Sequence, residues 1–285
     1  MFARPSHAAA WAGREDIAMT GQTILYTAGS DHIGELVLNR PAALNAYTSR
    51  MCSELVDALD AYQRDDRLRC LIITGAGRAF CAGGDVRGGD EEHDDYLRRQ
   101  LGHAVQMREG MHRVITALHR MDKPVIAMIN GHAVAGGLAL ALACDLRIAG
   151  ADAKLGDTSG RFGLLPDEGG AWLFPRAIGL DRALKMSWLA EIYSAEEALA
   201  LGLVTEVVPQ NKLHDHTREL AAAIAARAPI ATRLVKSMMR HGLDSTIERA
   251  LNDAAMAVMI ANPTADVREG VRAFAEKREP HFKGK

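Results

Sequence analysis

Two short apolar runs, each followed by a glycine-rich corner, constrain this chain most strongly. The run at 70–74 reads CLIIT, and the run at 124–130 reads PVIAMIN. Continuous apolar runs of this length are typical of strands buried on both faces, as in parallel sheets. The corners that follow are CAGGD at 81–85 and NGHAVAGG at 130–137. Because glycine lets a backbone approach a ligand closely and leaves its N–H pointing outward, both corners are candidate binding elements.

The segments around these runs predict alternating strands and helices. The stretch 34–40, GELVLNR, has the alternation of a strand. Thr48 can cap a helix that presents apolar side chains at helical spacing, and a second helical pattern covers about 101–121. Another strand is expected at 145–149, and helical patterns dominate from about residue 185. This order predicts an α/β fold with a helical extension.

The composition excludes several classes of partner. The 285 residues include 34 basic and 36 acidic side chains, so nothing indicates a nucleic acid or an anionic membrane surface. No apolar run approaches the length of about 18 residues that a membrane span needs. His103, His112 and His119 are interpreted as helix-face residues, and no H-x-x-x-H or H-E-x-x-H spacing indicates a metal site. No C-x-x-C spacing relates the four cysteines, which favours free thiols in a reducing cytoplasm. The cysteines are Cys52, Cys70, Cys81 and Cys144.

Two segments are expected to lie outside the packed core. Residues 1–20 lack the apolar core of a signal peptide and are interpreted as a flexible leader, in which Met19 could be the natural start. The charged segment 85–99, with DEEHDD at its centre, is interpreted as a mobile surface loop.

The second glycine corner combines two features that favour binding of an oxygen. Gly136 opens a bland run of small apolar residues that predicts a helix, and the start of a helix carries a partial positive charge. Two backbone N–H groups that converge on one oxygen form an oxyanion hole. The alternative is that the glycines only permit tight turns and close packing. Neither corner has the pattern of a P-loop or of a dinucleotide-binding loop.

A series of motifs in one order gives a more specific hypothesis. The motifs are LNRPAALNA at 38–46, AFCAGGD at 79–85, KPVIAMINGHAVAGG at 123–137, GLLPDEGG at 163–170 and AFAEKR at 273–278. With these motifs the chain resembles the enoyl-CoA hydratase/isomerase (crotonase) superfamily from about Thr23 to its C-terminus.

The resemblance implies a fold and an activity. The expected fold is a crotonase-like spiral of ββα repeats with a helical C-terminal trimerisation region, assembled as a homotrimer or a dimer of trimers. The expected division is a leader at 1–20, a spiral core at 21–205 and a helical region at 206–285. The expected activity acts on acyl-CoA thioesters through a stabilised enolate, and needs no cofactor beyond the coenzyme A of the substrate.

The resemblance also implies site residues. Gly84 and Gly136 match the two oxyanion-hole positions. The positions matched to coenzyme A and substrate binding are Ala82, Gly84, Asp85, Val86, Gly136, Phe274 and Lys277. Phe274 and Lys277 match positions that often reach coenzyme A from a neighbouring subunit. From the residues alone, Phe274 could instead be a core side chain and Lys277 an ordinary surface charge.

The chain departs from the hydratases of this family at two positions. These enzymes position water with two glutamates, and the matching positions here are Ala139 and Ser159. Alanine cannot hold a water molecule for attack, and serine has no pKa near neutrality. The usual hydratase mechanism is therefore not available at these positions.

One acid remains at a position that matches the catalytic acid of several isomerases. Asp167, in LPDEGG, could move a proton from C2 to C4 of a 3-enoyl-CoA, and Glu168 is the second candidate. We therefore favour double-bond isomerisation through Asp167. The alternatives are a divergent hydratase or an acyl-CoA hydrolase that uses Asp167 or Glu168, and a non-catalytic acyl-CoA-binding protein. The turn chemistry of PDEGG also allows Asp167 to be only a turn residue.

Overall fold

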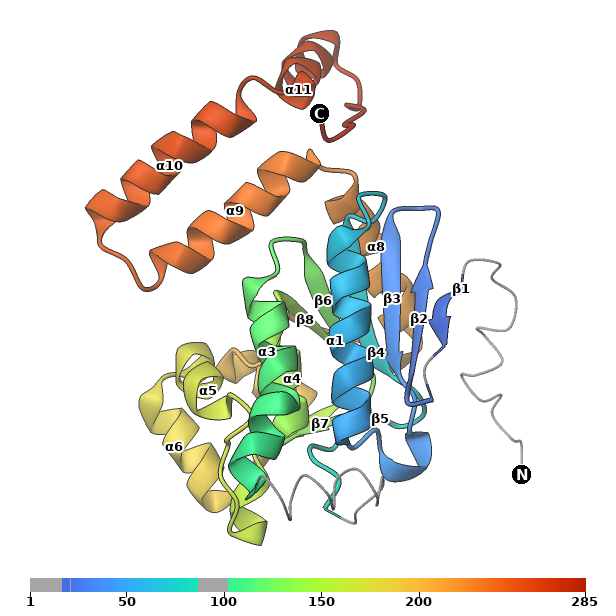
Figure 1. Ribbon diagram of the computed structural model, residues 1–285, viewed down its shortest axis with the longest axis vertical. Coiled ribbons are helices and arrows are strands. Elements are labelled where there is room, and N and C mark those ends of the chain that lie inside the picture. Colours follow the sequence, from blue (N-terminus) through green and yellow to red (C-terminus); the bar gives the residue numbers. More distant parts are fainter. Residues whose placement is uncertain (1–16, 21, 87–101) are drawn as a thin grey trace.

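The computed structural model describes residues 17–20, 22–86 and 102–285. Figure 1 shows a layered molecule, with strands at the centre, α1 and α3 on one face, α8 on the other, and α9 to α11 at one end. Among the described residues, no helix is long and apolar enough to cross a bilayer.

The larger sheet has seven strands and is parallel over most of its width. In spatial order these are β1 (Ile17–Thr20), β2 (Ile24–Ala28), β3 (Ile33–Leu38), β4 (Cys70–Gly75), β6 (Val125–Ile129), β8 (Leu146–Gly150) and β11 (Glu206–Val208). The pairs β1–β2 and β2–β3 are antiparallel, and the others are parallel. The two apolar runs form β4 and β6, whose side chains are all buried, as the sequence predicts.

The smaller sheet has four short strands. In spatial order these are β10 (Ile192–Ser194), β9 (Lys154–Gly156), β7 (His132–Val134) and β5 (Ala79–Cys81). The chain alternates between the sheets, because β4, β6 and β8 in the larger sheet are followed by β5, β7 and β9 in the smaller one. Helices separate these strand pairs, so the predicted spiral of ββα repeats is confirmed.

The helices cover both faces of the larger sheet and extend beyond it at one end of the molecule. They are α1 (Ser49–Arg64), α3 (Met111–Arg120), α4 (Gly136–Ala143), α5 (Gly170–Ile178), α6 (Leu180–Leu189), α7 (Ala195–Leu201), α8 (Leu213–Ala225), α9 (Pro229–Gly242), α10 (Ile247–Ala261) and α11 (Ala265–Glu276). The described residues also form three 3-10 turns: η2 (Pro41–Ala43), η3 (Ser159–Phe162) and η4 (Gln210–Lys212).

The start of α1 follows the sequence prediction. The Thr48 side chain accepts a hydrogen bond from the Met51 N–H at 3.3 Å, which satisfies one of the free donors of the first turn. The predicted helix at 101–121 is instead interrupted at Gly110, with residues 102–109 helical before it and α3 after it. A Cβ at Gly110 would lie 2.8 Å from the Gln106 carbonyl oxygen, so this close approach requires glycine.

The structure revises both ends of the predicted core. Ile17–Thr20 was assigned to the leader but forms β1, because its backbone pairs with β2; residues 1–16 lie outside the described residues. The predicted boundary at residue 206 also moves. Strand β11 extends the larger sheet, and α8 buries Leu213 and Ala221 against it, so the separate helical region begins at α9. Most of the loop predicted at 85–99 lies outside the described residues.

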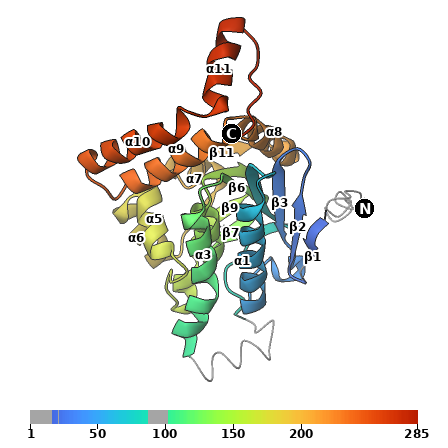
Figure 2. The same ribbon diagram turned by 45° about the horizontal axis from the view of Figure 1, so that its top comes forward.

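Helix α9 is attached to the core through Asp145, which directly precedes β8. Its carboxylate accepts a hydrogen bond from the Val125 N–H at 2.8 Å and forms ion pairs with Lys236 at 2.7 Å and Arg240 at 2.8 Å. Figures 1 and 2 show α10 and α11 beyond α9, at the end of the molecule opposite β5 and the start of α1.

Candidate active site

The two glycine corners meet at the ends of β5 and β7. Gly83 has a positive φ of 93°, and a Cβ on it would lie 3.0 Å from the Ala135 Cβ and 3.4 Å from the Gly136 nitrogen. A Cβ on Gly137 would lie 2.0 Å from the Cys81 carbonyl oxygen. The glycines therefore serve the close approach of two backbones, as well as turns.

Two backbone donors at this junction remain open. Among the described residues, neither the Gly84 N–H nor the Gly136 N–H donates a hydrogen bond to a protein acceptor. Gly136 is the first residue of α4, so its N–H has no partner within the helix and lies at the positive end of the helix dipole. Ala135, just before it, has an unusual backbone conformation with φ 50° and ψ −126°. Strain of this kind is concentrated at functional sites.

Tyr47 contacts both glycine corners where they meet. Its N–H donates to the Gly83 carbonyl oxygen at 2.9 Å, and the Asp85 N–H donates to the Tyr47 carbonyl oxygen at 2.9 Å. A Cβ on Gly84 would lie 3.3 Å from the Tyr47 hydroxyl oxygen, and one on Gly136 would lie 2.7 Å from the ring. The Tyr47 ring therefore lies against both glycines.

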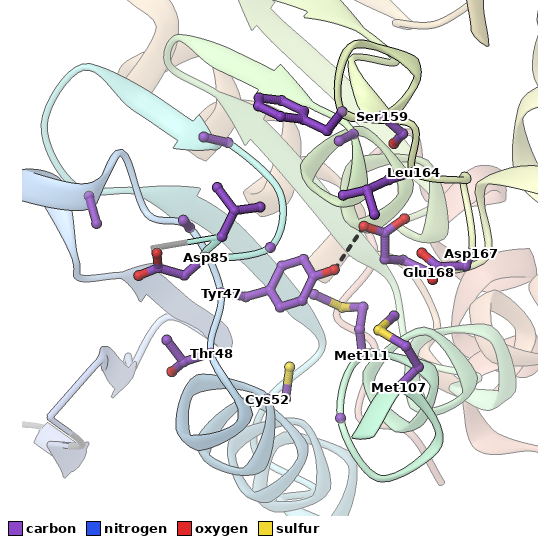
Figure 3. A pocket seen from close by; sticks show the side chains of 18 of the residues that line it. Tyr47, Thr48, Cys52, Asp85, Met107, Met111, Ser159, Leu164, Asp167 and Glu168 are labelled. Atoms are coloured by element: carbon purple, nitrogen blue, oxygen red, sulfur yellow. Dashed lines mark hydrogen bonds between the residues drawn. The ribbon is translucent and has the colours of Figure 1, made fainter. Parts of the chain in front are cut away.

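Glu168 lies at the hydroxyl end of this ring, and its side chain points into the pocket (Figure 3). The residue is only 6% exposed, and its Oε1 accepts a hydrogen bond from the Tyr47 hydroxyl at 2.8 Å. Its Oε2 is buried and has no hydrogen-bond partner among the described residues. Burial, with smaller contributions from Asp167 and Asp157, raises the pKa of Glu168 to about 7, although hydrogen bonds from its own backbone N–H and from Tyr47 oppose the rise.

Asp167 is directed differently from Glu168. Its side chain is 39% exposed, and in Figure 3 it points away from Tyr47. The His103 Nε2 lies 3.7 Å from the Asp167 carboxylate, and the His112 ring hydrogen-bonds to the Asp167 carbonyl oxygen at 2.7 Å. The two histidines, which the sequence placed only on helix faces, therefore contact this residue. The Glu168 carboxyl is therefore buried in the cavity and the Asp167 carboxyl is partly exposed, whereas the sequence ranked Asp167 first of the two acids.

A glycine in the left-handed region explains why the second acid faces inward. Gly169 has φ 116° and precedes α5, which begins at Gly170. A residue with a side chain rarely adopts this backbone conformation. The sharp turn at Gly169 lets α5 begin two residues after Glu168. The Glu168 carboxyl lies beside Gly136, and a Cβ on Gly136 would lie 2.6 Å from the Glu168 Oε1.

A cavity of about 490 Å³ contains these groups. Its lining includes Gly84, the two acids Asp167 and Glu168, and Ser159. Apolar side chains form much of its wall, among them Met107, Met111, Phe162, Leu164 and Leu165. Such a mixture of an apolar wall and a few polar groups is typical of a small-molecule site.

The positions predicted to bind coenzyme A separate into two groups. Ala82, Asp85 and Val86 line the cavity together with Gly84, and Asp85 is held there by an ion pair with Arg40 at 2.8 Å. Phe274 is 87% exposed, so it is not a core residue, and Lys277 ends α11. Figures 1 and 2 place α11 far from the cavity within one chain.

The two positions that lack the hydratase glutamates differ in exposure to the cavity. Ala139 is fully buried in α4. Ser159 lines the cavity, and its N–H donates to the Asp157 Oδ1 at 3.0 Å. The other oxygen of Asp157 is buried without a hydrogen-bond partner among the described residues. Neither position provides an acid or base for the cavity.

Sequence reasoning did not identify Tyr47 or the methionines of the wall. Tyr47 directly follows the motif that ends at Ala46 and directly precedes the helix cap Thr48. This position, between a candidate binding motif and a helix cap, was the available sign that Tyr47 belongs to the site. Nothing in the local pattern indicates its partner, which is 121 residues away.

Comparisons with known proteins agree with this fold. The model of the enoyl-CoA hydratase/isomerase family matches residues 28–285. A putative enoyl-CoA hydratase/isomerase of Bacillus subtilis is 38% identical over 265 residues, which cover 93% of this chain and 99% of the relative. The 1,2-epoxyphenylacetyl-CoA isomerase of Escherichia coli is 36% identical, over 88% of this chain and 94% of the relative.

Solved structures give the same result. The crystal structure of an enoyl-CoA hydratase from Bacillus anthracis has a TM-score of 0.86 and 34% sequence identity, and covers 93% of this chain and 100% of that chain. The chain belongs to the enoyl-CoA hydratase/isomerase family, and it is an acyl-CoA enzyme of that family.

Proposed function

We propose that the enzyme isomerises a 3-enoyl-CoA to a 2-enoyl-CoA, with Glu168 as the single acid/base. One observation carries this proposal. Glu168 is buried in the cavity with Oε1 bonded to Tyr47 and Oε2 unbonded, while Ala139 and Ser159 occupy the positions of the water-handling acids. A carboxyl with a pKa of about 7 can both accept and return a proton near neutral pH.

The proposed reaction needs no net proton and no water. The Glu168 carboxylate removes a proton from C2 of the substrate, and the electron pair moves through the thioester to give a dienolate. The neutral Glu168 then returns the same proton to C4, and the electrons move back to form the double bond between C2 and C3. Burial among apolar side chains keeps the proton from exchanging with bulk water.

The glycine corners would stabilise the charge that develops on the thioester oxygen. We assign this role to the N–H groups of Gly84 and Gly136, because both line or border the cavity and lack an acceptor among the described residues. Such donors contribute about 3–4 kcal/mol each when they are preorganised. Ala82, Asp85 and Val86 would contact the coenzyme A portion along the same corner.

Hydration of a 2-enoyl-CoA is the second candidate. The names of the relatives favour it, because more of these proteins are called hydratases than isomerases. Here Glu168 would activate water alone. Against this, the hydratases that the chain resembles use two glutamates. Neither glutamate is present here, because Ala139 and Ser159 occupy the matching positions.

Separate assays of the two substrates test the proposal. Purified enzyme is given 3-enoyl-CoA and 2-enoyl-CoA in turn, and both possible products are quantified. We expect 2-enoyl-CoA from the first substrate, and a loss of about 1,000-fold in this turnover in the Glu168→Gln variant. The control is Glu191→Gln, which removes a surface glutamate that also hydrogen-bonds to a tyrosine. Rapid hydration of 2-enoyl-CoA without isomerisation, or full turnover by Glu168→Gln, would contradict the proposal.

A further inference from the structure

The Tyr47 hydroxyl is the side-chain donor to the Glu168 carboxyl, and the residue's own backbone N–H is a second donor. Acidic groups also act on Glu168: Asp167 beside it, Asp157 after β9, and Cys81 at the end of β5. Each of these is negative when ionised, so each opposes ionisation of Glu168. The Tyr47 hydroxyl is the side-chain donor that favours the ionised form, because its O–H can donate to a carboxylate, and the backbone N–H of Glu168 acts in the same direction.

The backbone fixes where this hydroxyl can lie. Tyr47 is hydrogen-bonded on both sides to the first glycine corner, through Gly83 and Asp85, and α1 begins two residues later. The ring is also confined between Gly84 and Gly136. With its backbone and its ring both held, the phenol has little freedom to turn its hydroxyl away from Glu168.

The hydrogen bond also distinguishes the two oxygens of the carboxyl. Tyr47 has a single proton to donate, and it donates to Oε1. The other oxygen, Oε2, is left without a partner among the described residues. The bonded oxygen is therefore the anchored one, and the unbonded oxygen is available to exchange a proton with a ligand.

From this geometry we propose that Tyr47 is a positioning residue, which anchors Oε1 of Glu168 beside the glycine corners, favours the carboxylate form, and leaves Oε2 to move the proton. This inference rests on the proposed function for its catalytic consequence, but the contact itself does not depend on which reaction occurs. A side chain that only filled the pocket wall would serve equally well without its hydroxyl, and this difference is what the experiment measures.

The Tyr47→Phe variant removes the hydroxyl and keeps the ring between the glycines. We expect the acid limb of the isomerisation pH profile to move to higher pH by at least about half a pH unit, because the carboxylate loses its side-chain donor. Turnover at the alkaline plateau should fall by roughly 10-fold, because the carboxyl is no longer anchored. The matched control is Tyr193→Phe, which removes the hydroxyl that donates to Glu191 at 2.5 Å on the surface. This control should leave the profile unchanged.

A direct titration separates this inference from the proposed function. The carboxyl carbon of Glu168 is followed by 13C NMR in protein with labelled glutamate, and its signal is identified by its absence in Glu168→Gln. We expect the midpoint of titration to rise in Tyr47→Phe and to stay constant in Tyr193→Phe. Coincident titrations of the wild type and Tyr47→Phe would overturn the role of Tyr47. Full turnover by Glu168→Gln would overturn the proposed function, while the titration would still decide the role of Tyr47.

Discussion

The molecule contains the same pair of side chains in two surroundings. In the cavity, Tyr47 donates to Glu168 at 2.8 Å; at the surface, Tyr193 of β10 donates to Glu191 at 2.5 Å. The outcomes are opposite. Burial raises the pKa of Glu168 to about 7, whereas bonds from Lys185 and Tyr193 lower the pKa of Glu191 below its usual value. A tyrosine donor alone therefore does not determine the proton affinity of a glutamate.

Solvent and neighbouring charge account for the difference. The Glu191 side chain is 24% exposed, and its carboxylate forms an ion pair with Lys185 at 2.8 Å. Glu168 is 6% exposed, and its charged neighbours, Asp157 and Asp167, are acidic. Since an ionised carboxyl is disfavoured by loss of water and by negative neighbours, the cavity retains a proton near neutral pH and the surface does not.

Among the substitutions considered, Gly136→Ala should disturb the Tyr47–Glu168 hydrogen bond most. The new Cβ would lie 2.6 Å from the Glu168 Oε1 and 2.7 Å from the Tyr47 ring, so both side chains must move. We expect turnover on 3-enoyl-CoA to fall by about 100-fold or more, through loss of the anchored carboxyl and displacement of the backbone donor. Steady-state kinetics provide the measurement.

The control for this variant is Gly242→Ala at the end of α9. A Cβ there would contact nothing within 4 Å, and the residue does not have a positive φ. Its turnover should match that of the wild type. If Gly136→Ala kept turnover within about threefold of the wild type, the tight junction of the glycine corners would not matter for catalysis.

Stability measurements compare the two glutamates without substrate. Glu168 ionises at about pH 7 in the folded protein, against a usual value of 4.5, so the folded state holds more protons between these pH values. The free energy of unfolding should therefore fall as the pH rises from about 4.5 to 7. Glu168→Gln removes this loss and should be more stable than the wild type at pH 8, by up to about 3 kcal/mol, with little difference at pH 4.

The exposed glutamate should show the opposite sign. Because the pKa of Glu191 is lowered in the folded state, its charge stabilises the protein above its usual pKa, and that contribution is lost in acid. Glu191→Gln should therefore be slightly less stable than the wild type at pH 8. Urea unfolding at both pH values measures both differences. A Glu168→Gln variant less stable than the wild type at pH 8 would show that the buried carboxylate is not a destabilising charge.

The sequence predicted those parts of the site that depend on local pattern. Apolar runs identified β4 and β6, Thr48 identified the start of α1, and the glycine corners identified the two backbones that meet. Each of these features needs only a few consecutive residues to specify it. Burial on both faces, capping and close backbone approach are all properties of a short segment.

The choice between two adjacent acids could not be made in this way. Asp167 and Glu168 share one turn, and which of them faces the cavity depends on the positive φ of Gly169 and on the direction in which α5 leaves. The contact with Tyr47 spans 121 residues and exists only after the spiral has formed. Resemblance to isomerases placed the acid at Asp167, but the burial of each carboxyl is a property of the tertiary fold.

Asp167→Asn tests that choice and should have the smallest effect. Its carboxylate is 39% exposed and points away from Tyr47, so turnover at the pH optimum should stay within about threefold of the wild type. The substitution removes one negative neighbour of Glu168. In this respect the surroundings of Glu168 become more like those of Glu191. The acid limb of the pH profile should therefore move to lower pH, by roughly half a pH unit. Loss of turnover by 100-fold or more would instead make Asp167 the proton carrier, and Glu168 with Tyr47 would then form only the wall against which it works.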